Sequence, residues 1–303
     1  MSGDADARAR GEQVRTVSLR PTPPSAGAPV AAFTVDVEDW YQSCVDLDAP
    51  ITARVERNVS RVLEVLDEFR VKGTFFVQGR VAETFPRLVE TLVLEGHEVQ
   101  SHGYSHRALF EMDRRELREE LERAKQTVED ASGTRVRAFR AQDFSILSTN
   151  LWALEVLAEV GFEIDSSIFP IRMSRYGIAG WEPAPHRLKL ANGVTILEVP
   201  VATWPKTRVR LPVAGGGYFR VLPERVLVGA LRRIVAEQRP PVVYCHPYEF
   251  NPRELDDYRD VVGAARRWSQ SVGRGALVCR VRAMLGTLSF GRFDETLAAW
   301  GLA

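Results

Sequence analysis

Ser101-His102-Gly103-Tyr104-Ser105-His106 places two of the five histidines four residues apart, directly after the strand-like run 96–100. A helical turn between them would direct both imidazoles at one divalent cation, and Gly103 makes such a turn easy after a strand. On spacing alone, a surface or capping pair is the commoner interpretation. Carboxylates are the natural further ligands, and three of them are crowded into Thr34-Val35-Asp36-Val37-Glu38-Asp39-Trp40. One strand end with acids and another with histidines therefore predict a hydrolytic metal site.

Apolar runs that alternate with amphipathic segments predict the fold around these two strand ends. The run 30–35 is continuously apolar, as in a buried parallel strand, whereas 52–69 has a helical period. Further strands are predicted at 73–77, 96–100, 137–140, 162–165, 194–199 and 241–246, and helices at 85–94, 113–131, 149–160 and 223–236. We expect 170–193 to be irregular and 215–220 to be a flexible loop.

This rhythm of strands and helices is typical of parallel βαβ units and of an α/β barrel. An α/β barrel keeps its active site at the C-terminal ends of its strands. The sequence places four charged or titratable residues at predicted strand ends, namely Asp36, His102, Arg140 and Asp165.

Composition bounds the class of protein. The chain has 303 residues, 45% of them hydrophobic, which is enough for a substantial core. Forty acids balance forty lysines and arginines, so no global charge favours nucleic acid or an anionic membrane, and no stretch resembles a membrane span. Three distant cysteines favour a reducing compartment, so we expect the cytoplasm. Residues 1–28 lack an apolar h-region and are expected to form a disordered leader.

Five motifs, in this order, resemble those of the polysaccharide deacetylases of carbohydrate esterase family 4. They are Thr34–Asp39, Ser101–His106, Phe139–Ser145, Asp165–Pro170 and Tyr244–Glu249. Within that family, the Val-Asp-Val-Glu-Asp motif, the stretch 215–220 and the segment 251–303 resemble the branch associated with exosortase and exopolysaccharide loci. The resemblance implies a distorted (β/α) barrel of about seven strands. The catalytic domain would occupy 29–250, and a helical extension at 251–303 would pack on the barrel.

The resemblance also implies a metal site. His102 and His106 would be ligands, with a carboxylate from the first motif as the third. Strand parity favours Glu38, whereas a turn at the strand end favours Asp39. We favour Asp39, because a shorter side chain is more easily shaped into a tight site. Zinc is the favoured metal, with cobalt, nickel and manganese as alternatives.

The remaining roles complete a hydrolytic mechanism. Asp36 would be the general base, paired with Arg140, and His246 would be the general acid, with Asp165 as a candidate for tuning it. The backbone N–H of Asp143 would polarise the substrate carbonyl, and Gln142 stands where the family usually has proline. Two aromatic residues in irregular segments, Trp181 and Tyr218, are expected to bind substrate.

The predicted activity is metal-dependent removal of acetyl groups from N-acetylated sugars of an exopolysaccharide or its precursor. Exopolysaccharide assembly proteins are the expected protein partners. One alternative is a small-molecule amidohydrolase of the allantoinase-like type. Another is a non-catalytic sugar-binding subunit of a polysaccharide assembly complex.

Overall fold

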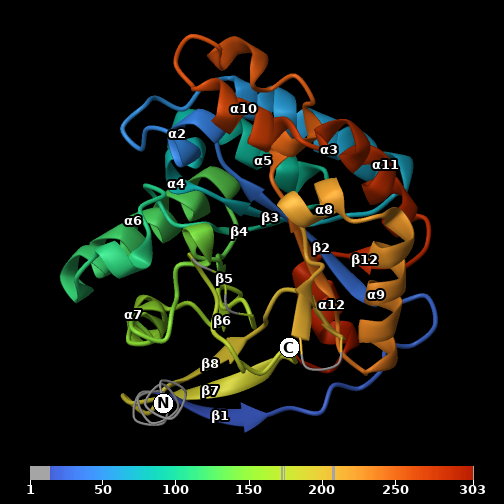
Figure 1. Ribbon diagram of the computed structural model, residues 1–303. Helices are drawn as coiled ribbons and strands as arrows, with labels where there is room; N and C mark the ends of the chain where they lie inside the picture. Colours follow the sequence, from blue (N-terminus) through green and yellow to red (C-terminus); the bar gives the residue numbers. More distant parts are fainter. Residues whose placement is uncertain (1–13, 172, 174, 207–208, 303) are drawn as a thin grey trace.

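A computed structural model describes residues 14–302 except 172, 174 and 207–208, and one large sheet lies at its centre (Figure 1). Seven parallel strands are adjacent in the order β11-β2-β3-β4-β5-β6-β8. Their bounds are β2 (Ala31–Val37), β3 (Thr74–Val77), β4 (Glu98–Ser101), β5 (Ala138–Phe139), β6 (Ile164–Asp165), β8 (Thr195–Glu198) and β11 (Val242–Cys245). The predicted α/β fold with about seven barrel strands is thereby confirmed.

The ring of strands closes through irregular chain between β8 and β11. The Ala202 N–H donates to the Val242 carbonyl at 2.9 Å, and the Tyr244 N–H donates to the Ala214 carbonyl at 2.8 Å. A Cβ on Gly215 would lie 1.6 Å from the Tyr244 carbonyl oxygen, so the close approach of these two backbone segments requires glycine. The barrel is therefore distorted at this seam.

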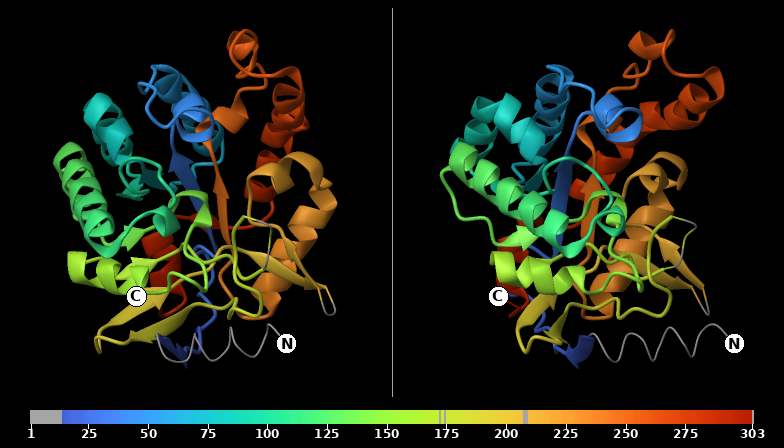
Figure 2. Two further views of the ribbon diagram at one scale, coloured as in Figure 1. Left: turned by 60° about the vertical axis from the view of Figure 1, so that its left-hand side comes forward. Right: turned by 90° about the vertical axis from the view of Figure 1, so that its left-hand side faces the viewer.

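Helices surround the sheet, as both views in Figure 2 show. They are α3 (Arg54–Glu68), α4 (Gly79–Thr84), α5 (Pro86–Leu94), α6 (Arg114–Ser132), α7 (Ala153–Val160), α9 (Glu224–Ala236) and α11 (Arg274–Leu285). Their amphipathic pattern explains this position: α3 buries Val55, Val59 and Val62 against the core and exposes its charges. Helix α6 begins with a capping box at Asp113 and ends at Gly133, which has φ 66°.

Three expectations about loops were wrong. Residues Val14–Ser18, inside the predicted leader, form β1, which pairs antiparallel with β7 (His186–Leu190); residues 1–13 lie outside the described chain. Strand β7 itself lies in the segment expected to be irregular, because its buried and exposed residues alternate with the period of a strand. The expected flexible loop at 215–220 forms helix α8 (Gly217–Val221) for most of its length.

The chain after residue 251 joins the same core. Strand β12 (Phe290–Gly291) pairs parallel with β2, and helix α12 (Phe293–Ala299) follows it. The Trp300 indole donates to the Val30 carbonyl at 3.1 Å. The remaining elements are α2 (Trp40–Cys44), the hairpin β9 (Thr203–Lys206) and β10 (Val209–Pro212), and α10 (Ala264–Ser271). Among the described residues, no helix combines the length and apolarity that crossing a membrane requires.

Candidate metal centre and catalytic site

A cavity of about 130 Å³ lies where the chain leaves strands β2, β4, β5 and β11. Because these strands are parallel, the residues that follow them meet at one end of the sheet. Its lining residues are Asp36, Glu38, Cys44, His102, His106, Ala141, Asp143, Phe144, Tyr176, Tyr244, His246 and Tyr248. The sequence predicted six of these residues as site residues.

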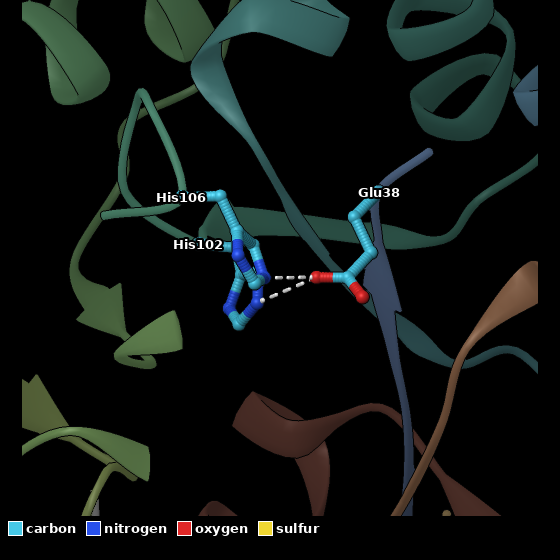
Figure 3. Close-up of side chains that lie close together, drawn as sticks. All are labelled: Glu38, His102 and His106. Atoms are coloured by element: carbon cyan, nitrogen blue, oxygen red, sulfur yellow. Dashed lines mark ion pairs between the residues drawn. The ribbon is translucent and has the colours of Figure 1, made fainter. Parts of the chain in front are cut away.

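Glu38, His102 and His106 form a compact buried group in this cavity (Figure 3). Glu38 Oε2 lies 2.5 Å from His106 Nε2 and 3.4 Å from His102 Nε2. His102 is oriented by its other nitrogen, since Nδ1 lies 2.9 Å from the Arg140 carbonyl and donates to it. His106 has a left-handed backbone conformation with φ 72°, which turns its ring back towards His102. Both imidazoles therefore present Nε2 to one carboxylate oxygen.

This group fits a divalent metal. The three ligand atoms lie within 4.8 Å of one another, and two imidazoles with one carboxylate are a common zinc donor set that leaves a position open. Burial raises the pKa of Glu38, but the charge of His106 and the hydrogen bonds of both histidines outweigh it and hold that pKa well below its ordinary value. Glu38 is thus kept ionised, as a ligand must be.

Asp39, which the sequence interpretation favoured as the ligand, has a different position. It is the N-cap of α2, where Oδ1 accepts from the Tyr41 N–H at 3.0 Å, and Oδ2 accepts from both the N–H and the hydroxyl of Thr52. Both oxygens are occupied by this capping role. These contacts make Asp39 a less suitable ligand and favour Glu38, the alternative that strand parity places on the same face as Asp36.

Asp36 and Arg140 form a buried ion pair beside the metal group. Arg140 Nη1 lies 2.7 Å from Asp36 Oδ1, and the same nitrogen donates to the Thr34 hydroxyl at 2.7 Å. The guanidinium also donates to the carbonyl and hydroxyl of Ser166 and lies over the Phe76 ring. Because these contacts fix the guanidinium, it holds Asp36 in one orientation at the cavity wall.

His246 follows β11 and lies against a carboxylate that the sequence interpretation did not assign. Its Nδ1 is 3.2 Å from Glu249 Oε2, and its Nε2 is 3.9 Å from Glu38 Oε1. Burial lowers the pKa of His246, but the hydrogen bond to Glu249 and the charges of Glu38 and Glu249 outweigh it and raise that pKa to about 9. The raised pKa favours the protonated form of His246 at neutral pH.

Asp165, the candidate for tuning His246, lies instead in a separate buried cluster. It accepts hydrogen bonds from the hydroxyl and N–H of Ser167 and contacts Glu198, its partner in register on β8. Burial raises the pKa of both carboxyl groups. The carboxylate that contacts His246 Nδ1 in this structure is that of Glu249, so the structure does not bring Asp165 to His246.

The loop after Arg140 contributes Asp143 to the cavity wall. Asp143 and Phe144 have φ values of 52° and 49°, which is unusual for residues other than glycine and occurs at functional sites. The side chain of Gln142 is fully buried against Gly103, and neither of its polar atoms has a hydrogen-bond partner in the described chain. The carboxylate of Asp143 pairs with Arg175 at 3.3 Å.

The two aromatic candidates for substrate binding differ. Trp181 is buried beside His186 and is not part of the cavity wall, so the structure does not place it at the site. Tyr218 is adjacent to the cavity, since its hydroxyl lies 3.2 Å from that of Tyr176, which lines the wall. Sequence reasoning gave no site role to Cys44, Phe144, Tyr176, Tyr244, Tyr248 or Glu249. The available signal for three of them was the motif Tyr244–Glu249 around His246, which contains Tyr244, Tyr248 and Glu249.

Two family models match the chain next to each other. Residues 27–163 match the model described as polysaccharide deacetylase. Residues 27–163 are a polysaccharide deacetylase domain. Residues 166–298 match a domain of unknown function, DUF3473. The cavity combines both parts, because the deacetylase domain supplies Glu38, His102 and His106 and the second part supplies His246.

Curated relatives of this deacetylase domain include two enzymes with sugar substrates in their names. A peptidoglycan deacetylase of Helicobacter pylori is 28% identical over 58% of this chain and 65% of its own length. A chitooligosaccharide deacetylase of Sinorhizobium fredii is 34% identical over 39% of this chain and 54% of its own length. The chain therefore spans less than two thirds of the length of these relatives.

Solved structures share the fold over most of the chain. A protein of Mycobacterium smegmatis, provisionally described as a polysaccharide deacetylase, has a TM-score of 0.57 at 20% identity and covers 94% of this chain and 95% of its own. An allantoinase structure has a TM-score of 0.58 at 16% identity, and the match covers 92% of this chain and 94% of the allantoinase chain. At these identities the likeness shows the fold alone.

Proposed function

We propose that this protein is a metal-dependent N-deacetylase of N-acetylated sugars. One observation carries the proposal: a candidate metal-ligand group, an acid held by an arginine and a histidine hydrogen-bonded to a carboxylate lie at the same small cavity. The names of the relatives support a sugar as substrate. The expected reaction adds water to the acetyl carbonyl, breaks the C–N bond and releases acetate and a free amine.

Glu38, His102 and His106 would hold the metal, which when bound would supply Lewis-acid polarisation of the carbonyl and a water of lowered pKa. We propose zinc, with cobalt, nickel and manganese as alternatives. Asp36, fixed by Arg140, accepts a proton from the attacking water.

The other half of the reaction depends on residues that follow β5 and β11. His246 directs Nε2 into the cavity and donates a proton to the leaving nitrogen, which must become an amine as the C–N bond breaks. The backbone N–H of Asp143 is proposed to bind the carbonyl oxygen, where a fixed donor stabilises developing negative charge. Tyr218, whose hydroxyl is hydrogen-bonded to that of Tyr176 in the cavity wall, is proposed to contact the part of the sugar that lies outside the cavity.

The natural substrate is proposed to be an exopolysaccharide or its precursor, with exopolysaccharide assembly proteins as partners. The support is the resemblance of the first motif and of the stretch 215–220 to the exopolysaccharide-associated branch. The cytoplasm is the proposed compartment, and all three cysteines have free thiols, as a reducing compartment favours.

The test is acetate release from a substrate panel by the purified protein, depleted of metal and then supplied with one metal at a time. The panel contains N-acetylated chito-oligosaccharides, fragments of an N-acetylated exopolysaccharide and allantoin, since the fold is shared with an allantoinase. We expect acetate and an equal amount of free amine from a sugar, only with metal. Allantoin hydrolysis without acetate release would favour the amidohydrolase, and sugar binding without hydrolysis would favour the binding subunit.

A further inference from the structure

A short turn, η3 (Pro247–Phe250), directly after β11, contacts both halves of the proposed site. Its residues are buried, and Glu249 exposes 2% of its surface. The turn begins at His246 and contributes two side chains, Tyr248 and Glu249, to which the sequence interpretation gave no role. Their contacts carry a separate inference about how the site is held in shape.

Glu249 fixes the imidazole of His246. One oxygen, Oε2, accepts from the His246 backbone N–H at 3.0 Å and from ring atom Nδ1 at 3.2 Å. The other oxygen, Oε1, lies 3.4 Å from Arg220 Nε. Since Nδ1–H is donated to Glu249, the opposite ring nitrogen, Nε2, is the one that faces the cavity.

Tyr248 contacts both His246, the proposed general acid, and Glu38, the proposed metal ligand. Its ring stacks on His246 with centroids 5.0 Å apart and planes 7° apart. Its hydroxyl donates to Glu38 Oε1 at 2.9 Å, so the other oxygen of the same carboxylate, Oε2, is directed at the two metal histidines. Glu38 has more rotatable bonds than an aspartate would have, and this hydrogen bond selects one of its rotamers.

We propose that Tyr248 and Glu249 are the positioning residues of the site: Tyr248 orients the metal carboxylate of Glu38, and Glu249 orients the acid His246. This inference rests on the proposed function, because it assigns residues to the same metal centre and the same proton transfer. It moves the role predicted for Asp165 to a residue three positions after the histidine. A residue that orients a metal ligand contributes about 10- to 100-fold in affinity or activity.

The two roles are separable by two conservative variants. Tyr248→Phe keeps the ring and its stacking and removes only the donor to Glu38, so zinc affinity measured by calorimetry should fall about 10- to 100-fold. Glu249→Gln keeps the shape but replaces the acceptor of Nδ1–H, so zinc affinity should stay near that of the natural protein. The turnover ratio between an acetamide and an activated aryl acetate should fall instead, because only the amide leaving group needs a proton.

Matched controls come from residues close by that touch neither Glu38 nor His246 in the described structure. Tyr258→Phe removes a buried hydroxyl that has no hydrogen-bond partner in the described chain. Glu254→Gln changes a buried carboxylate that accepts from Asn58 at 3.0 Å and Asn251 at 2.8 Å. Both controls should leave zinc affinity and the amide-to-ester ratio unchanged, whatever they do to stability.

A readout without turnover keeps the inference testable. In protein labelled with ¹⁵N-histidine, the Nδ1–H proton of His246 should resonate downfield as a hydrogen bond to a carboxylate, and Glu249→Gln should move it upfield while Glu254→Gln leaves it in place. Unchanged zinc affinity in Tyr248→Phe would overturn the first role. An unmoved Nδ1–H signal, or equal losses on amide and ester, would overturn the second. A natural protein that binds zinc but releases no acetate would contradict the proposed function alone.

Discussion

Replacing Glu38 by glutamine tests which acid of the first motif completes the metal group. The amide has almost the same volume but lacks the charge that Glu38 Oε2 presents to His102 and His106. Asp39→Asn is the matched control, because Asp39 is occupied as the cap of α2, and asparagine caps helices about as well as aspartate. Metal affinity should therefore fall in the first variant and persist in the second.

The expected size follows from linkage between binding and folding. Loss of one of three protein ligands should cost at least the ~10- to 100-fold that loss of a positioning contact costs. At a metal concentration about 1,000 times the dissociation constant, bound metal stabilises the folded state by about 4.1 kcal/mol. A 10- to 100-fold weaker site leaves about 2.7 to 1.4 kcal/mol of this stabilisation, so about 1.4 to 2.7 kcal/mol is lost. At about 2 °C per kcal/mol, this loss lowers the metal-induced rise in Tm by roughly 3 to 5 °C.

The assay is differential scanning calorimetry of each variant with and without metal at that fixed concentration. The metal-induced shift is compared, since the variants also change the stability of the metal-free protein. A full shift in Glu38→Gln, or a lost shift in Asp39→Asn, would refute the assignment of Glu38 as the ligand.

Three further outcomes are expected. Asp39→Ala removes the cap of α2 and the hydrogen bonds from Thr52, which should lower the free energy of unfolding by about 2 to 4 kcal/mol in urea titrations; a neutral effect would contradict the capping role. Burial raises the pKa of Glu198, so its contribution to stability is complete below the ordinary pKa of a glutamate and is lost as pH rises through the raised value; Glu198→Gln should flatten this decline in stability, and an unchanged slope would contradict this. Although burial alone would lower the pKa of His246, its hydrogen bond to Glu249 helps raise it to about 9, so kcat/KM on an acetamide should decline as pH passes 9. His246→Ala should abolish that alkaline decline, and its survival would argue against the acid role.

Strong periodic signals made most of the barrel predictable. The apolar run before Asp36 and the helical period of 52–69 correspond to β2 and α3 within one or two residues. Strand β7, which also pairs antiparallel with its sequence neighbour β8, was not foreseen, and neither was β1, which is short and pairs with β7 across a long sequence separation. Local propensity carries little information about such a pairing.

The site shows the same division. His102, His106, Asp36 and Arg140 were predictable because each follows an expected strand, and the barrel brings strand ends together. The carboxylate partner of His246 was not predictable from the sequence, because the choice between Asp165 and Glu249 depends on which carboxylate the backbone turns towards the imidazole ring. The choice between Glu38 and Asp39 depends on similar information, since Asp39 is the N-cap of α2 in the structure.

The most direct test of the central claim compares the natural protein with Asp36→Asn, both loaded with the same metal, on an N-acetylated chito-oligosaccharide. The amide cannot accept the proton of the attacking water, although Arg140 and the three metal-binding side chains stay in place. The proposed function predicts acetate release by the natural protein and a loss of about 10²- to 10⁴-fold in the variant at equal metal content. Equal acetate release by both proteins, or none by the metal-loaded natural protein, would contradict it.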